Sequence, residues 1–125
     1  MPKPRLKHLL HVSILISDLE RSLQFYQEIL GLEVDPQRPD LGFPGAWLNL
    51  SGGQIHLLQL ENPDPVTGRP SHGGRDRHFA VSVVNLSDIK IKLNSHGVRY
   101  TESKSGRLAL FVRDPDGNAV ELIED

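Results

Sequence analysis

The sequence predicts an α+β fold made of two similar units, each with one strand, one helix and three further strands. Two observations carry this prediction. Strand-like and helix-like segments follow one another in the same order in both halves of the chain, and short patterns recur at a nearly constant offset. His11 and His78 are 67 residues apart, and Gly52 and Gly117 are 65 residues apart. Such a duplication predicts mainly antiparallel sheets with the helices on one face.

The composition places these units in one globular domain, residues 1–125. A chain of 125 residues with 38% hydrophobic and 24% charged residues is long enough for a core and is not disordered. The net charge of −2 lacks the basic footprint of a nucleic-acid binder. No apolar run reaches the ~18 residues of a membrane span, and the N-terminus does not resemble a signal peptide, so we expect a cytoplasmic protein.

The first unit, about residues 7–60, opens with a strand at His11. A helix is expected over 19–30, because Ser17 or Asp18 can cap its start and Gly31 can end it. Its apolar residues recur at helical spacing and form one buried stripe. Three strands are expected to follow, at 32–35, 46–50 and 54–60, with a hairpin turn at 51–53.

The second unit, about residues 77–125, repeats this order after a proline- and glycine-rich linker at 61–76. A strand opens at His78, and a helix is expected over 86–96, capped by Asn85 or Ser87 and ended by Gly97. The remaining strands are expected at 98–102, 107–113 and 118–123, with a tight turn at 114–118 between the last two.

Strand parity picks out four residues that can bind a metal. Successive side chains on a strand point to opposite faces, so each opening strand has one apolar face and one small, polar face. His11 and His78 fall on the polar faces at equivalent positions of the repeat, and so do His56 and Glu121. If the units are related by a pseudo-two-fold axis, these four side chains can converge near it. Three imidazoles and one carboxylate suit Zn, Ni, Co, Fe or Mn.

The remaining histidines, His8, His72 and His96, receive no metal role. The chain has no cysteine, which excludes thiolate ligands and cysteine nucleophiles. Two interpretations of the segment from Arg69 to Arg77 stand side by side: a solvated loop, or a loop whose arginines contact an anion.

Two stretches, HVSILISDLERSLQFYQEILGLE near the start and RDPDGNAVELIE at the end, resemble the vicinal oxygen chelate superfamily. This superfamily includes glyoxalase I, bleomycin-resistance proteins and extradiol dioxygenases. The resemblance covers nearly the whole chain. It implies paired βαβββ modules that form an open, cup-shaped sheet with the helices outside, around a divalent metal ion. It also implies a small-molecule substrate, and a homodimer with sites shared between the chains.

The four ligand positions of glyoxalase I-like members fall on His11, His56, His78 and Glu121. The resemblance implies a lyase or isomerase that stabilises an enediolate, with Glu121 as the base that moves a proton between substrate carbons. Glyoxalase I usually has glutamate where this chain has His56. The other three ligands resemble the set of extradiol dioxygenases and of fosfomycin-resistance thiol transferases. A third interpretation is a non-catalytic binding protein of the bleomycin-resistance kind. Any thiol in the reaction must arrive with the substrate.

Overall fold

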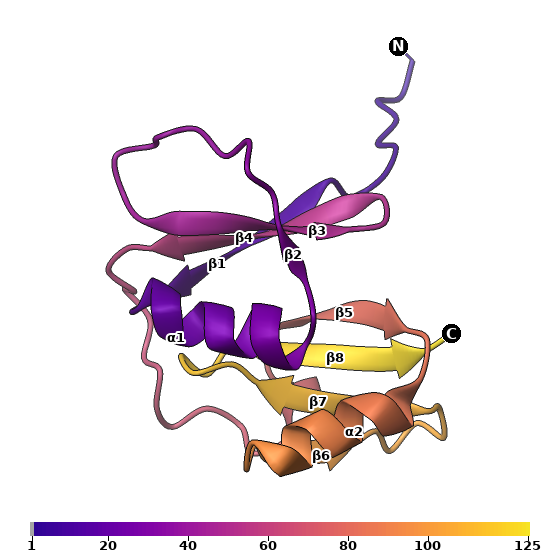
Figure 1. The fold of residues 1–125 in the computed structure, drawn as a ribbon. Coiled ribbons are helices and arrows are strands. Elements are labelled where there is room, and N and C mark those ends of the chain that lie inside the picture. The colour runs from indigo at the N-terminus through magenta and orange to yellow at the C-terminus, as the bar shows by residue number, and fades with distance from the viewer. Residues whose placement is uncertain (1) are drawn as a thin grey trace.

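The computed structural model describes residues 2–125, and it contains two four-stranded sheets (Figure 1). In each sheet the opening strand pairs in parallel with the last strand of its module, and the other pairs are antiparallel. The two-module α+β fold is therefore confirmed. The first sheet has the order β1 (His11–Ile16), β4 (Gly53–Gln59), β3 (Gly45–Leu50), β2 (Glu33–Val34); the second has β5 (His78–Val83), β8 (Ala119–Glu124), β7 (Ala109–Arg113), β6 (Tyr100–Glu102).

The helix of the first module is two segments in succession, α1 (Leu19–Leu23) and η1 (Gln24–Ile29). The Asp18 side chain accepts hydrogen bonds from two backbone amides of the first turn, as expected of an N-cap. The second segment is wound as a π-helix, which helical periodicity did not predict. Gly31 follows with a φ of +77°, a conformation that only glycine adopts without strain.

In the second module the helix is α2 (Leu86–Ser95), and Asn85 caps it by accepting from the Asp88 amide. Predicted and observed ends agree to within a residue or two for both helices and most strands. A short 3₁₀ turn, η2 (Gly73–Arg75), interrupts the linker. Among residues 2–125, no helix is long and apolar enough to cross a membrane.

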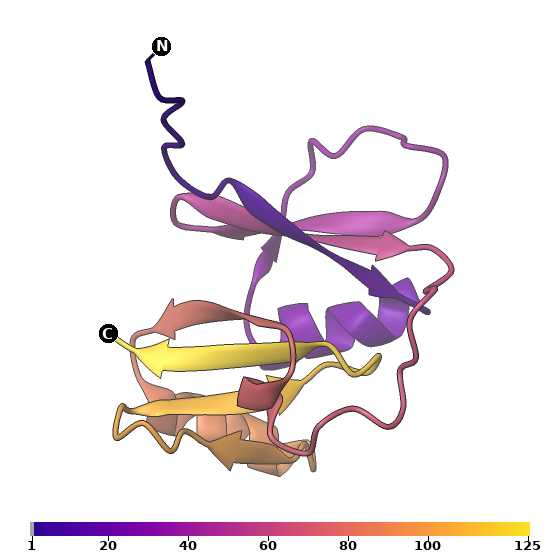
Figure 2. The same cartoon turned by 180° about the vertical axis from the view of Figure 1, so that it is seen from behind.

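One hydrophobic core joins the two modules. It contains the apolar faces of both sheets together with residues of η1 and α2. The predicted parity is confirmed, because Val12 and Ile14 of β1 pack toward this core while His11 and Ser13 are exposed. On β5, Phe79 packs inward in the same way. Figure 2 shows the N-terminal segment extending away from both sheets. The polar face of each sheet therefore lies on the outside of the shared core.

A buried hydrogen bond connects the helix of the first module to the last turn of the second. The Tyr26 hydroxyl donates to the Asp114 carboxylate over 2.8 Å, and neither side chain is more than 5% exposed. Asp114 also accepts from the backbone amides of Asp116 and Asn118. Burial raises the pKa of Asp114, whereas these hydrogen bonds oppose the rise. Burial and the nearby Asp114 raise the pKa of Tyr26, so it remains a donor at neutral pH.

The same turn also contacts the end of β1. Asn118 donates through its side-chain amide to the Leu15 carbonyl over 3.0 Å, and Asp116 accepts from the Ser17 amide over 3.1 Å. The residues Asp114 to Asn118 therefore act as a structural connector between modules, and their conformation depends on the Asp114 side chain.

Replacing Tyr26 by phenylalanine should lower the free energy of unfolding by about 1–3 kcal/mol, because the buried Asp114 carboxylate loses one of the two donors to its Oδ2 and keeps only the Asn118 side-chain amide there. Urea unfolding of the purified protein measures this change. The matched control is Tyr100→Phe, in which a half-buried tyrosine of β6 loses the same atom outside this cluster. Equal stability of the two variants would contradict the connecting role of Tyr26.

Candidate metal centre

The strand register brings the predicted site residues to equivalent places in the two sheets. In the first sheet His56 of β4 lies between Ser13 of β1 and Trp47 of β3. In the second, Glu121 of β8 lies between Ala80 of β5 and Phe111 of β7. His56 and Glu121 are thus matched positions of the duplicated fold, as the repeat predicted, and each has an aromatic side chain on the neighbouring strand.

His78 and Glu121 form a close pair in the second module. Nε2 of His78 lies 3.4 Å from Oε1 of Glu121, and the Glu121 side chain is only 6% exposed. The other ring nitrogen of His78, Nδ1, lies 2.9 Å from the backbone carbonyl oxygen of Asp76. Because a carbonyl oxygen only accepts, Nδ1 must carry the hydrogen of that bond. The neutral ring would therefore direct the Nε2 lone pair toward the carboxylate, as a metal ligand does.

The Glu121 carboxylate is nearly buried, whereas the His78 side chain is 26% exposed. Two acceptor atoms that face each other at this distance require a cation between them, either a proton or a metal ion. Two donors bound tetrahedrally to zinc at about 2.1 Å lie about 3.4 Å apart, which matches the distance between Nε2 and Oε1. A backbone carbonyl that holds the second nitrogen of a ligand histidine is also usual at metal sites. The second-module pair therefore fits a divalent metal ion.

The linker reaches this pair through Asp76. The Asp76 carboxylate accepts from Nε and Nη2 of Arg69 at 2.8 and 2.6 Å, and from Arg113 at 2.8 Å. These arginines hold the pKa of Asp76 well below its usual range. Arg113 also donates to the carbonyls of Gly117 and Pro70, which ties the linker to the connector turn. Asp76 thereby holds the carbonyl that orients His78, a role that sequence analysis did not assign.

Two of the three linker arginines have partners within the chain. Arg69 is engaged by Asp76 and by the Pro65 carbonyl, and Arg77 pairs with Asp64 over 3.0 Å at the exposed surface. The third, Arg75, is exposed. The segment is a loop, as expected, and the ion pair of Asp76 with Arg113 holds it against the second sheet.

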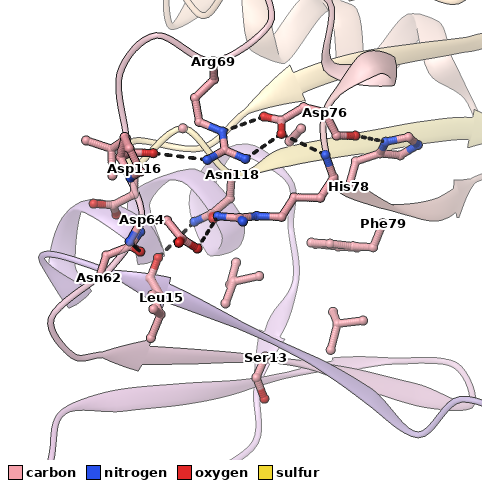
Figure 3. Close-up of a pocket in the computed structure, with 17 residues that line it drawn as sticks. Ser13, Leu15, Asn62, Asp64, Arg69, Asp76, His78, Phe79, Asp116 and Asn118 are labelled. Atoms are coloured by element: carbon pink, nitrogen blue, oxygen red, sulfur yellow. Dashed lines mark hydrogen bonds and ion pairs between the residues drawn. The ribbon is translucent and has the colours of Figure 1, made fainter.

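A cavity of about 340 Å³ lies between the linker and β1, with His78 in its wall (Figure 3). Its lining combines apolar side chains, such as Leu15 and Phe79, with the charged groups of Asp64 and Asp116. A volume of this size admits a small organic molecule. The cavity therefore gives His78 an adjoining space for a substrate, whereas Glu121 is not among its lining residues.

His11 and His56 also form a pair, but their geometry differs. Their rings stack 3.9 Å apart at an angle of 9°, and Trp47 stacks on the other face of His56 at 4.6 Å. Because lone pairs lie in the ring planes, two parallel rings do not direct their nitrogens at one point. A shared metal ion would require one ring to rotate. Burial, together with the nearby His11 and Arg38, lowers the pKa of His56, which favours the neutral imidazole that metals bind.

Gln54 determines which nitrogen of His56 is free. The amide nitrogen of Gln54 donates to Asp35 and Asn49, so its oxygen accepts from His56 Nε2 over 2.8 Å. Nε2 therefore carries hydrogen, and only Nδ1 of His56 keeps a lone pair in this arrangement. Gln54 is a second residue that sequence reasoning missed, although its place two residues before His56 on the same face of β4 was readable from the strand pattern.

The two pairs do not meet within one chain. No group of three or more histidine, aspartate or glutamate side chains that could hold one metal ion is present among residues 2–125. The expectation that all four converge near the axis is therefore not met within this chain. The reason is that the apolar faces of both sheets share one core, so the polar faces are directed outward, and β1 and β5 are not paired with each other. The chain carries two half-sites.

The three histidines without a predicted role lie elsewhere. His8 is in the exposed N-terminal segment, and His96 contacts the Lys92 carbonyl at the end of α2. His72 accepts from the Gly74 amide, and its ring lies 4.9 Å from that of Phe111.

Arg107 is a further residue that composition and periodicity did not mark. It pairs with Oε2 of Glu121 over 3.1 Å.

Comparison with known proteins identifies the family. Residues 8–122 match the model of the Glyoxalase/Bleomycin resistance protein/Dioxygenase superfamily. The chain belongs to this superfamily. It is 32% identical over 118 residues to glyoxylase I 4 of Arabidopsis thaliana, which covers 90% of this chain and 67% of the relative. It is 30% identical to a lactoylglutathione lyase of Escherichia coli O157:H7, over 94% of this chain and 92% of the relative.

A solved structure extends the similarity to three dimensions. The trypanothione-dependent glyoxalase I of Leishmania major superposes with a TM-score of 0.69 at 27% identity, over 95% of this chain and 87% of that one. The superfamily includes lyases and dioxygenases, so membership supports an enzyme without selecting a reaction.

Replacing Asp76 by asparagine should release the linker, because the two arginine contacts lose their charged partner. Limited trypsin digestion should then cleave at the linker arginines about tenfold faster, with the sites identified by mass spectrometry. Asp64→Asn, which removes an exposed partner of Arg77, should leave the rate nearly unchanged. Equal rates in both variants would show that Asp76 does not restrain the linker.

Proposed function

We propose that this chain is a divalent-metal-dependent enzyme of the glyoxalase I type, a lyase or isomerase acting on a small oxygenated substrate such as a thiol adduct. The observation that carries the proposal is the pair His78 and Glu121, whose facing acceptor atoms have the separation of two zinc ligands. The similarity to a lactoylglutathione lyase over nearly the full length of both chains supports the reaction class.

His11 and His56 would complete the coordination from a second copy of the chain. Each half-site offers two ligands, whereas a catalytic centre usually takes three or more from protein. A two-fold symmetric homodimer that sets the first sheet of one chain against the second sheet of the other would form two complete centres. The outward direction of both polar faces leaves them accessible to such a partner.

The ion, when bound, would polarise the substrate oxygens and stabilise the negative charge that develops in the transition state. The chain's own groups do the rest. Glu121 is the acceptor that takes a proton from one substrate carbon and returns it to the neighbouring one. Asp76, through its carbonyl, keeps His78 in the tautomer with a free Nε2. The cavity beside His78 would hold the substrate next to one of the proposed ligands of the ion.

Substitution of either member of the second-module pair should abolish tight metal binding. Elemental analysis of purified His78→Ala and Glu121→Gln should give less than about a tenth of the zinc, nickel, cobalt or manganese content of the unaltered protein, since ligand loss costs far more than loss of an outer contact. The control His96→Ala removes a histidine outside both half-sites and should keep full content. Full metal content in both test variants would refute the site.

Mixing two inactive variants should restore activity if sites are shared. In a dimer of His11→Ala with His78→Ala, one centre carries both defects and the other carries none. Random exchange of subunits should therefore make roughly a quarter of all centres intact. Thioester formation from the methylglyoxal–glutathione adduct is the assay, with sedimentation to verify a mass near twice 14.0 kDa. No recovery of activity on mixing would place each site within one chain. No turnover by the unaltered protein loaded with zinc, nickel, cobalt or manganese would refute the lyase.

An extradiol dioxygenase is the second candidate, and the hydrogen bond between Gln54 and His56 favours it. If His56 keeps this hydrogen bond and its stacked contact with the His11 ring, it does not bind the metal. The remaining ligands are then His11, His78 and Glu121, a set that suits Fe(II). Ring cleavage of a catechol by the Fe(II)-loaded protein with oxygen would select this reaction over the lyase. A binding protein without chemistry would hold no stoichiometric metal at all.

A further inference from the structure

We propose that Arg107 binds an anionic group of the substrate beside Glu121, so that this protein acts on molecules with a carboxylate or a phosphonate next to the reacting oxygens. The role of Glu121 as the base beside the anion rests on the proposed function. The anion site itself rests only on the contacts of Arg107. Its guanidinium lies 3.1 Å from Oε2 of Glu121, on the side opposite the His78 contact to Oε1.

Arg107 lies two residues before β7, in a bend outside the strand pairing. β7 is the neighbour of β8, and Phe111 of β7 lies directly opposite Glu121. The guanidinium of Arg107 therefore reaches the Glu121 carboxylate from the loop that leads into β7. It contacts the candidate centre at one end and solvent at the other, since its side chain is 58% exposed.

The loop before β7 holds Arg107 in this orientation. Arg107 donates through Nε to the Ser105 hydroxyl over 3.2 Å, and Ser105 is bonded in turn to the Ser103 hydroxyl over 2.8 Å. Gly106, between them, has a φ of +85°, which a residue with a side chain rarely adopts. The stem of Arg107 is thus fixed by local hydrogen bonds.

Arg107 keeps donors for a further acceptor. A guanidinium has five N–H groups in a planar fork. Nη2 contacts Glu121 and Nε contacts Ser105, whereas Nη1 makes no hydrogen bond to the described residues 2–125. Arginine forks match the geometry of a carboxylate or a phosphonate with two parallel hydrogen bonds. An anion bound at Nη1 of Arg107 would lie close to Glu121, the group that we propose as the base.

The charges at the proposed centre also favour an anion. A divalent ion, the single carboxylate of Glu121 and the guanidinium of Arg107 leave two uncompensated positive charges, because the three histidine ligands are neutral. A centre with this excess attracts an anionic ligand and disfavours a neutral one of the same shape.

Isothermal titration calorimetry with glycolate and with glycolamide tests the proposal, because the two probes have similar shapes and differ in charge. The protein is measured zinc-free and zinc-loaded, as the full chain. We expect glycolate to bind at least about tenfold more weakly to Arg107→Gln than to the unaltered protein, whereas glycolamide should bind both equally weakly. The control Arg99→Gln removes the same charge from an exposed arginine just before β6 and should change neither value.

Hydroxymethylphosphonate, titrated in parallel, distinguishes the two anions, because the preferred one should show the larger loss in Arg107→Gln. A change of less than twofold for both anions, or an equal loss in Arg99→Gln, would overturn the proposal. Zinc content and the thermal midpoint of each sample are measured alongside, to exclude damage to the fold. If the unaltered protein binds none of zinc, nickel, cobalt and manganese, the proposed function fails, while the arginine effect on metal-free protein still decides the anion site.

Discussion

The buried hydrogen bond between the Tyr26 hydroxyl and the Asp114 carboxylate is the contact on which the relation of the two modules depends. Apolar packing is non-directional and would tolerate several placements of one sheet against the other. A buried carboxylate tolerates few, because each of its oxygens needs a donor. Asp114 finds them in Tyr26 from the first module and in the backbone of its own turn. The turn is thereby positioned against β1, where Asn118 and Asp116 add two further contacts.

The same turn connects the fold to the candidate centre. Arg113 precedes it and reaches both the Gly117 carbonyl and the Asp76 carboxylate. Asp76 in turn offers its carbonyl to His78. A chain of polar contacts therefore extends from the helix of the first module to a candidate ligand of the second. The ligand pair is supported on one side by this chain and on the other by Arg107, which contacts the remaining oxygen of Glu121.

Local chemistry made much of the architecture predictable. Capping residues such as Asp18 and Asn85 act within three residues of themselves, so sequence reveals where both helices begin. Strand parity is equally local, and it separated the core face of β1 from the face that carries His11. The π-helical turn of η1 was not predictable in this way, because both windings place apolar residues at similar spacing. The role of Asp76 was hidden as well, since its partner Arg113 is 37 residues away.

The sequence by itself determined the duplicated α+β unit, the superfamily and the pairing of equivalent positions: His11 with His78, and His56 with Glu121. These follow from periodicity and repetition, which are properties of the chain alone. Only the tertiary structure decided which side chains actually meet. It brings His11 to His56 and His78 to Glu121, each within one sheet, and keeps the two pairs apart. The physical reason is that both sheets bury their apolar faces in one common core, which directs the polar faces outward.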